Sequence, residues 1–191
     1  MLAVELLATG ASLLFLVLLI REKILCWPFG IAGSLLSVYL FIQTRLYSEA
    51  VLYLFYALMG VWGWIRWQRR GEDDNNPVIV WPLALHLRGA ALACLGALGL
   101  GYLATYYSDA SRPLIDAFTT AFSFLATYME INKVLEGWIY WFFLNLVSIW
   151  LYQDRSLDIY AALIAVYSVL SVVGFLSWLK SYRTQAPAAG Q

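Results

Sequence analysis

Charged residues are scarce in this 191-residue sequence. Only 13% of its residues are Asp, Glu, Lys or Arg, whereas soluble domains carry roughly a quarter. Hydrophobic residues make up 62% of the chain, and they form runs long enough to cross a bilayer. The charges fall in short groups between those runs. This balance excludes an ordinary soluble domain and predicts about seven membrane spans with little else.

Histidine, cysteine and catalytic motifs are also scarce. His86 is the single histidine, so histidine ligands cannot assemble a zinc or haem site, and we expect no metal and no cofactor. The sequence has neither a phosphate-binding glycine loop nor a G-x-S-x-G nucleophile turn. Cys26 and Cys94 stand in apolar surroundings, where packing is the simpler interpretation. We therefore expect a protein that is not an enzyme.

Long apolar stretches predict an all-α integral membrane protein. The loop Gly71–Pro77 is the one plainly solvated segment between them, and Val78–Arg88 is mixed enough to belong to a span or to the membrane surface. The seven predicted spans are about Leu2–Ile20, Ile24–Ile42, Ala50–Ile65, Gly89–Tyr107, Leu114–Ile131, Gly137–Tyr152 and Leu157–Leu179.

The basic residues predict an orientation. Of the 12 Lys and Arg residues, all but Arg45, Arg112 and Arg155 fall on the side of the membrane that holds the C-terminus. Cytoplasmic segments are enriched in Lys and Arg. We therefore expect the N-terminus outside and the C-terminus in the cytoplasm.

The sequence also contains an internal repeat. A shift of about 111 residues, called the repeat spacing below, superposes two copies of one unit without a gap from Trp27 to Trp67. Three spans, one linking span and three more spans give both copies the same orientation, which makes a parallel 3+1+3 repeat typical of transporters. We expect a first bundle at 1–70, a loop and linking helix at 71–113, a second bundle at 114–180 and a cytoplasmic tail at 181–191. The matched pairs include Trp27 with Trp138, Ser34 with Asn145, Leu46 with Leu157, Gly63 with Gly174 and Trp67 with Trp178.

The sixth span carries a candidate binding face. Trp138, Trp141 and Asn145 follow one another at i, i+3 and i+7, so they share one side of a helix. Large flat rings with one amide suit an aromatic ligand that has a polar edge. An amide inside an apolar span must find polar partners, and the matched Ser34 is polar too. For the tryptophans, anchoring at the membrane interface is the alternative.

The fifth span carries a polar stripe. Thr120, Ser123, Thr127 and Glu130 are spaced i, i+3, i+7 and i+10, and either helix packing or a substrate pathway would explain them. Glu130 attracts a cation in the second interpretation, or pairs with Lys133 in the first. No ionisable residue falls at the centre of a predicted span, which favours passive transport over ion coupling.

Several motifs resemble one family of vitamin carriers. They are Trp27-Pro28-Phe29-Gly30, Gly63-Trp64 with Trp67, Trp138 with Trp141 and Asn145, and Leu151-Tyr152. In this order they resemble the PnuC-type vitamin transporters. The resemblance implies a SWEET-like fold, usually in a homotrimer. It also implies facilitated diffusion of nicotinamide riboside, or in close relatives thiamine or riboflavin, with trapping by a cytoplasmic kinase.

The resemblance assigns substrate binding to Trp141 and Asn145. The sequence departs from nicotinamide riboside carriers at Tyr53 and Thr127, where those carriers tend to have glutamine, and at Glu130, where they are usually apolar. Nicotinamide riboside and thiamine both carry a fixed positive charge on an aromatic ring, which suits stacking on tryptophan beside an acid.

We therefore expect a multi-pass transporter of the bacterial inner membrane that takes up a cationic B-vitamin, with nicotinamide riboside ahead of thiamine. Its partners are the vitamin, the lipid bilayer, further copies of itself and a cytoplasmic kinase, and no nucleic acid is expected. A non-transporting membrane sensor or assembly protein is the alternative. The expected substrate-binding residues are Trp141, Asn145, Trp138, Ser34, Trp27, Tyr53, Thr120, Ser123, Thr127 and Glu130.

Overall fold

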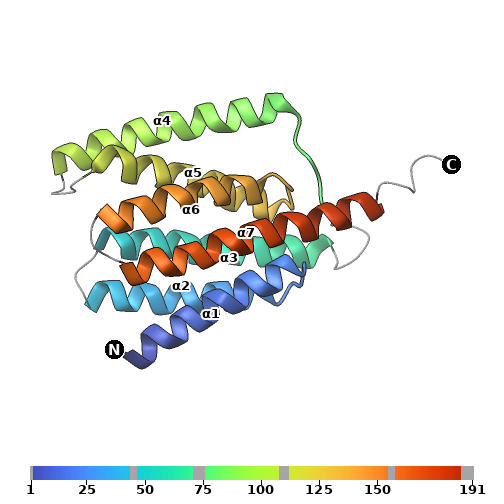
Figure 1. Ribbon diagram of the computed structural model, residues 1–191, viewed down its shortest axis with the longest axis horizontal. Coiled ribbons are helices and arrows are strands. Elements are labelled where there is room, and N and C mark those ends of the chain that lie inside the picture. The colour runs from blue at the N-terminus through green and yellow to red at the C-terminus, as the bar shows by residue number, and fades with distance from the viewer. Residues whose placement is uncertain (1, 44–46, 71–75, 108–111, 155–157, 186–191) are drawn as a thin grey trace. The chain divides into compact units, whose positions relative to one another are not determined.

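The computed structural model describes residues 2–43, 47–70, 76–107, 112–154 and 158–185, and these ranges fold into seven α-helices (Figure 1). Their number and order agree with the predicted spans. Leu46, Leu157, most of the loop Gly71–Pro77 and the end of the tail lie outside the described residues. The helices are α1 (Leu2–Ile20), α2 (Cys26–Gln43), α3 (Tyr47–Arg70), α4 (Leu83–Tyr107), α5 (Pro113–Ile131), α6 (Gly137–Asp154) and α7 (Asp158–Gln185).

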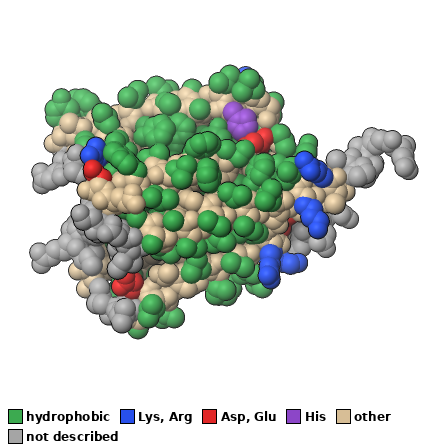
Figure 2. Space-filling model, viewed as in Figure 1, with side chains coloured by type: hydrophobic (Ala, Val, Ile, Leu, Met, Phe, Trp, Pro, Cys, Tyr) green, Lys and Arg blue, Asp and Glu red, His purple; other side chains and the backbone are tan. Residues whose placement is uncertain are grey.

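Most of these helices have the character of membrane spans. Among the described residues, α1, α2, α3, α4 and α7 are long and apolar enough to cross a membrane. Apolar side chains cover much of the visible surface, and the charged groups seen there gather towards helix ends (Figure 2). Helices α5 and α6 are 19 and 18 residues long, and they carry the polar candidate residues. They are not among the helices that meet this criterion.

The chain divides into two compact units, Met1–Pro77 and Val78–Gln191. Helices α1, α2 and α3 pack together in the first unit, whereas α4 packs against α5 in the second. The linking helix therefore belongs with the second bundle. It begins at Leu83, ahead of the predicted start at Gly89.

The segment before α4 pairs with the turn between α5 and α6. The Ile79 N–H donates to the Lys133 carbonyl at 2.9 Å, and the Leu135 N–H donates to the Ile79 carbonyl at 2.9 Å. Within α4, His86 lies 3.2 Å from the Tyr140 hydroxyl and 3.7 Å from the Glu136 carboxylate. The mixed segment is therefore partly a bridge and partly the first turn of α4.

In the first unit, a tryptophan pair joins α2 to α3. The ring of Trp27 meets Trp67 edge to face, with centroids 5.4 Å apart and an interplanar angle of 86°. A Cβ at Gly63 would lie 2.5 Å from the Trp27 ring. The indole therefore fits only because residue 63 has no side chain.

The second unit repeats this arrangement between α6 and α7. Trp138 meets Trp178 at 5.3 Å and 89°, and a Cβ at Gly174 would lie 2.6 Å from the Trp138 ring. These three residues match Trp27, Gly63 and Trp67 at the repeat spacing. Each unit thus contains the same Trp–Gly–Trp contact.

The turn before each of these contacts also has the same backbone conformation. Glu22 has φ 57° and Lys133 has φ 51°, and they are the two non-glycine residues with positive φ in the described chain. They match at the repeat spacing. Each left-handed residue ends one helix a few residues before the next begins.

Candidate substrate-binding site

Asn145 lies in α6 and is held by α7. Its side chain is 8% exposed, and its Nδ2 donates to Ser171 Oγ at 3.3 Å. The Ser171 hydroxyl in turn donates to the Tyr167 carbonyl at 2.9 Å. The expected polar partner of the amide is therefore Ser171, which the sequence analysis did not identify.

Glu130 and Trp141 meet where α5 packs against α6. Glu130 is 5% exposed, and the indole N–H of Trp141 lies near its carboxyl group. The Trp141 Nε1 is nevertheless fully buried with no acceptor inside ordinary limits of distance and angle. The two groups therefore face each other without an aligned hydrogen bond, because a well-formed one needs a near-linear approach.

The predicted pairing of Glu130 with Lys133 is not seen. The Lys133 backbone N–H donates to the Glu130 carbonyl at 3.0 Å, but no ion pair joins these two side chains among the described residues. A buried carboxyl group beside an indole is well suited to a cationic ligand, because a countercharge offsets its desolvation.

Trp138 and Trp27 lie inside their respective units. They are 1% and 2% exposed, each packed on a glycine and a second tryptophan as described above. Their Nε1 atoms have no hydrogen-bond partner among the described residues. These positions fit helix packing, and direct contact of either ring with a substrate stays a prediction.

The hydroxyl groups of α5 are partly used within the helix. Thr127 Oγ1 donates to the Ser123 carbonyl at 2.8 Å, so its oxygen remains as an acceptor. Ser123 and Thr127 are 8% and 7% exposed, respectively, and Thr120 is half-buried. At helical spacing they continue the Glu130 face towards the start of α5.

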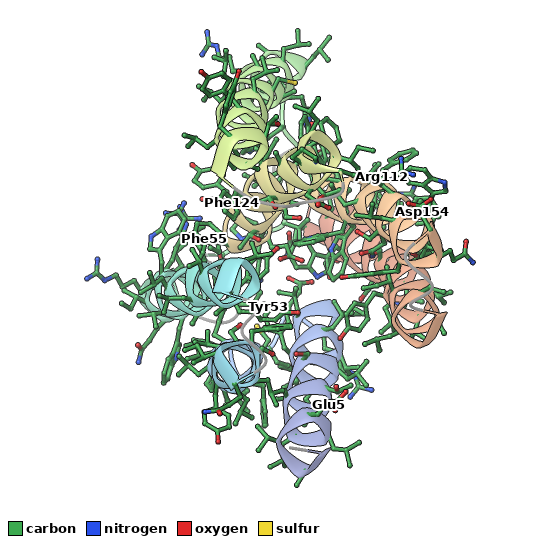
Figure 3. The ribbon with its side chains drawn as sticks, turned by 90° about the vertical axis from the view of Figure 1, so that its left-hand side faces the viewer. Glu5, Tyr53, Phe55, Arg112, Phe124 and Asp154 are labelled. Atoms are coloured by element: carbon green, nitrogen blue, oxygen red, sulfur yellow. The ribbon has the colours of Figure 1, made fainter. Side chains whose placement is uncertain are left out.

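Two predicted residues belong to the first unit. Ser34 is 8% exposed. Tyr53, labelled in Figure 3, is half-buried in α3, with its ring centroid 5.2 Å from Phe41 and 5.7 Å from Tyr56. Its ring is therefore part of an aromatic cluster between α2 and α3.

The start of α5 is tied to the end of α6 by an ion pair. Arg112 donates from Nε and Nη2 to the two carboxylate oxygens of Asp154, at 2.8 Å and 3.0 Å (Figure 3). Its guanidinium also lies 4.9 Å from the centroid of the Trp150 ring. This contact secures the ends of the two helices that carry the candidate site.

The polar candidate residues are concentrated in the second unit. At the repeat spacing, three of their four counterparts are leucine or glycine, and the fourth is a shorter polar residue. Glu130 corresponds to Leu19, Trp141 to Gly30, Asn145 to Ser34 and Ser171 to Gly60. The two copies share their packing residues and differ at these positions, so most of the candidate binding residues lie in the second copy.

A surface groove between α5 and α6 is distinct from the candidate site. Its volume is about 340 Å³ and its lining is almost entirely apolar. None of the candidate residues lines it, so a polar cation has no evident place there. The lining residues are Phe118, Phe122, Ile139, Tyr140, Phe143, Leu144 and Val147.

Comparison with known proteins shows one family. The sequence profile described as nicotinamide mononucleotide transporter matches residues 2–180. The nicotinamide riboside transporter PnuC of Escherichia coli (strain K12) is 22% identical over 212 residues, covering 97% of this chain and 89% of the relative. The protein of the same name from Shigella flexneri gives the same values.

The fold also matches a solved structure. A crystal structure of the vitamin B3 transporter PnuC superposes with a TM-score of 0.77 at 22% identity, covering 94% of this chain and 82% of that one. At this identity the likeness establishes the fold.

Proposed function

Because this chain belongs to the nicotinamide mononucleotide transporter family, we propose that it takes up nicotinamide riboside by facilitated diffusion. It is a transporter rather than an enzyme, and a multi-pass protein of the inner membrane. The supporting observation is the meeting of Glu130 and Trp141 one helical turn from Asn145. An indole, a buried carboxyl group and an amide together suit a ligand whose ring carries a fixed positive charge and a hydrogen-bonding edge.

Each group has a role in this proposal. Trp141 stacks on the pyridinium ring, with a cation–π contribution of about 0.5–2 kcal/mol. Glu130 supplies the countercharge. Its negative charge favours a riboside over a mononucleotide, because the phosphate of a mononucleotide is also negatively charged. Asn145 binds a polar group at the edge of the ring. As further substrate-binding residues we propose Thr120, Ser123, Thr127 and Trp138 of the second unit, and Ser34, Tyr53 and Trp27 of the first unit.

The proposed architecture is a SWEET-like pair of three-helix bundles, α1–α3 and α5–α7, joined by α4. The matched Trp–Gly–Trp contacts and the matched left-handed residues support a parallel repeat. The excess of basic residues on one side supports an external N-terminus. Rocking of one bundle against the other would alternate access. We further propose a homotrimer and trapping of the product by a cytoplasmic kinase.

Thiamine is the second candidate substrate, and Glu130 is the observation that favours it. The acid recognises a fixed positive charge on an aromatic ring, and thiamine carries one as nicotinamide riboside does. Tyr53 and Thr127 stand where nicotinamide riboside carriers tend to have glutamine. Riboflavin is larger and uncharged, so it fits this site less well. A non-transporting sensor would not exchange the vitamin across the membrane.

Counterflow in proteoliposomes tests the proposal. Vesicles loaded with unlabelled nicotinamide riboside are expected to accumulate the labelled compound, and a protonophore should leave the exchange intact because no ionisable residue marks a mid-membrane relay. Empty vesicles and vesicles loaded with riboflavin are the controls. Exchange of thiamine alone would assign the second substrate. Loss of exchange with the protonophore would show ion coupling, and no exchange of either vitamin would favour a non-transporting protein.

Replacing Glu130 by glutamine is expected to weaken nicotinamide riboside binding about 3- to 30-fold. The variant keeps the size and polarity of the side chain and removes the negative charge, whose attraction for a cation a few ångströms away is of that order in a partly screened site. Titration calorimetry measures the change. The neutral dihydro form of nicotinamide riboside is the matched ligand, and an equal loss of its affinity would show that Glu130 does not select for charge.

A further inference from the structure

Two hydrogen bonds in series determine which atom of the Asn145 amide faces away from α7. Ser171 Oγ lies 2.9 Å from the Tyr167 carbonyl and 3.3 Å from Asn145 Nδ2. A serine hydroxyl has one hydrogen to donate. Because that hydrogen goes to the Tyr167 carbonyl, Ser171 can only accept from Asn145. The amide must therefore direct its NH₂ group towards α7.

The amide oxygen is then left for another donor. Within the part of the chain that the structure describes, Asn145 Oδ1 has no hydrogen-bond partner. Asn145 and Ser171 are 8% and 3% exposed, but Asn145 Oδ1 is not one of the fully buried atoms without a partner, so a ligand can reach it. An amide oxygen without a donor is unfavourable in a largely buried position. The position therefore favours a ligand that brings an N–H or O–H group.

We propose that Ser171 is a positioning residue that fixes the Asn145 oxygen towards the substrate, and that the site thereby selects a ring bearing a carboxamide N–H donor. The inference rests on the proposed function. Trp141 and Asn145 are one helical turn apart on α6, so a ring stacked on Trp141 presents an edge substituent to Asn145. In nicotinamide riboside the carboxamide is such a substituent.

This device is confined to the second unit. At the repeat spacing Ser171 corresponds to Gly60, which has no hydroxyl, and Asn145 corresponds to Ser34, which has no amide. A Cβ at Gly60 would lie 2.9 Å from Ile31 Cγ1. The glycine in the first unit therefore serves close packing, whereas the serine in the second unit orients a polar group.

The test compares two ribosides that differ in one donor. The riboside of 3-acetylpyridine keeps the ring charge and the carbonyl of nicotinamide riboside, and it has a methyl group in place of the NH₂. Calorimetry on the detergent-purified wild type is expected to show a preference for the carboxamide of about tenfold or more, as for a lost hydrogen bond in an enclosed site. In Ser171→Ala the amide can turn over, and the preference should fall to about threefold or less.

Ser168 supplies the matched control. It is a second buried serine of α7, and its hydroxyl donates to the Ile164 carbonyl at 3.1 Å. Ser168→Ala should keep the wild-type preference, because it removes a comparable hydroxyl that does not hold Asn145. Ser171→Thr, which retains a hydroxyl, should keep most of the preference. An equal loss of affinity for both ribosides in Ser171→Ala would overturn the inference and leave Ser171 as a packing residue.

The design separates this inference from the proposed function. If the wild type binds nicotinamide riboside but does not discriminate against the acetyl compound, the inference fails and the proposed function stands. If the folded wild type binds only thiamine, the substrate assignment fails. Thiamine and its analogue with oxygen in place of the amino group then provide the same comparison of donors. If no vitamin binds, both fail.

Discussion

Replacing Trp141 by alanine is expected to weaken the binding of nicotinamide riboside by about 5- to 400-fold. The estimate combines a cation–π contribution of about 0.5–2 kcal/mol with about 0.5–1.5 kcal/mol for ring stacking beyond the area buried. Calorimetry on the purified variant measures the loss. Its elution volume and melting temperature in detergent should stay close to those of the wild type, since the ring of Trp141 is not packed against Gly174 as Trp138 is.

Two variants make this result specific. Trp64→Ala removes an exposed indole of the first unit, and it should bind the vitamin as the wild type does. Trp141→Phe keeps a ring for stacking and removes the N–H that faces Glu130, so its loss should be intermediate. Unchanged affinity in Trp141→Ala would remove this residue from the site, and the Glu130–Trp141 meeting point would then be structural.

Replacing Gly174 by alanine is expected to destabilise the second unit by about 1–3 kcal/mol, the range for overpacking a well-filled core. The added methyl group would lie 2.6 Å from the Trp138 ring, and that ring is held on its other side by Trp178. The indole must therefore shift. A fall in the melting temperature of the purified protein, followed by tryptophan fluorescence, measures the effect.

Gly99 is the matched control for this prediction, because a Cβ there meets nothing within 4 Å. Gly99→Ala lies in the exposed part of α4 and should leave the melting temperature unchanged or slightly raised. Trp138→Leu in the Gly174→Ala background should recover part of the loss, since it makes room for the methyl group and the two effects are then not additive. Equal behaviour of the two alanine variants would contradict the proposed close contact.

The local features of the fold were predictable from the sequence because they depend on short-range pattern. Apolar runs of bilayer length gave the seven helices in the right order, and most boundaries fell within a few residues. The start of α4 was placed too late because Leu83–Arg88 mixes apolar residues with His86 and Arg88. His86 in this stretch contacts Tyr140 and Glu136, which lie far away in the sequence.

The candidate site was predictable only in part. Helical spacing placed Trp138 and Asn145 on one face, and both indeed contact α7. The same spacing could not show that Trp141 meets Glu130 of α5, or that Glu130 is not paired with Lys133. Ser171 was missed because a serine in an apolar span is common. Its partner Asn145 is 26 residues away.

The sequence by itself determined the class of protein, the helices and the two copies of the unit, because hydropathy and internal repetition are properties of the chain read in order. Tertiary structure decided which tryptophans pack and which one faces an acid. It also decided which way the Asn145 amide is turned. These depend on where side chains from different helices meet, and two copies with the same packing residues can still differ in the polar groups that they bring together.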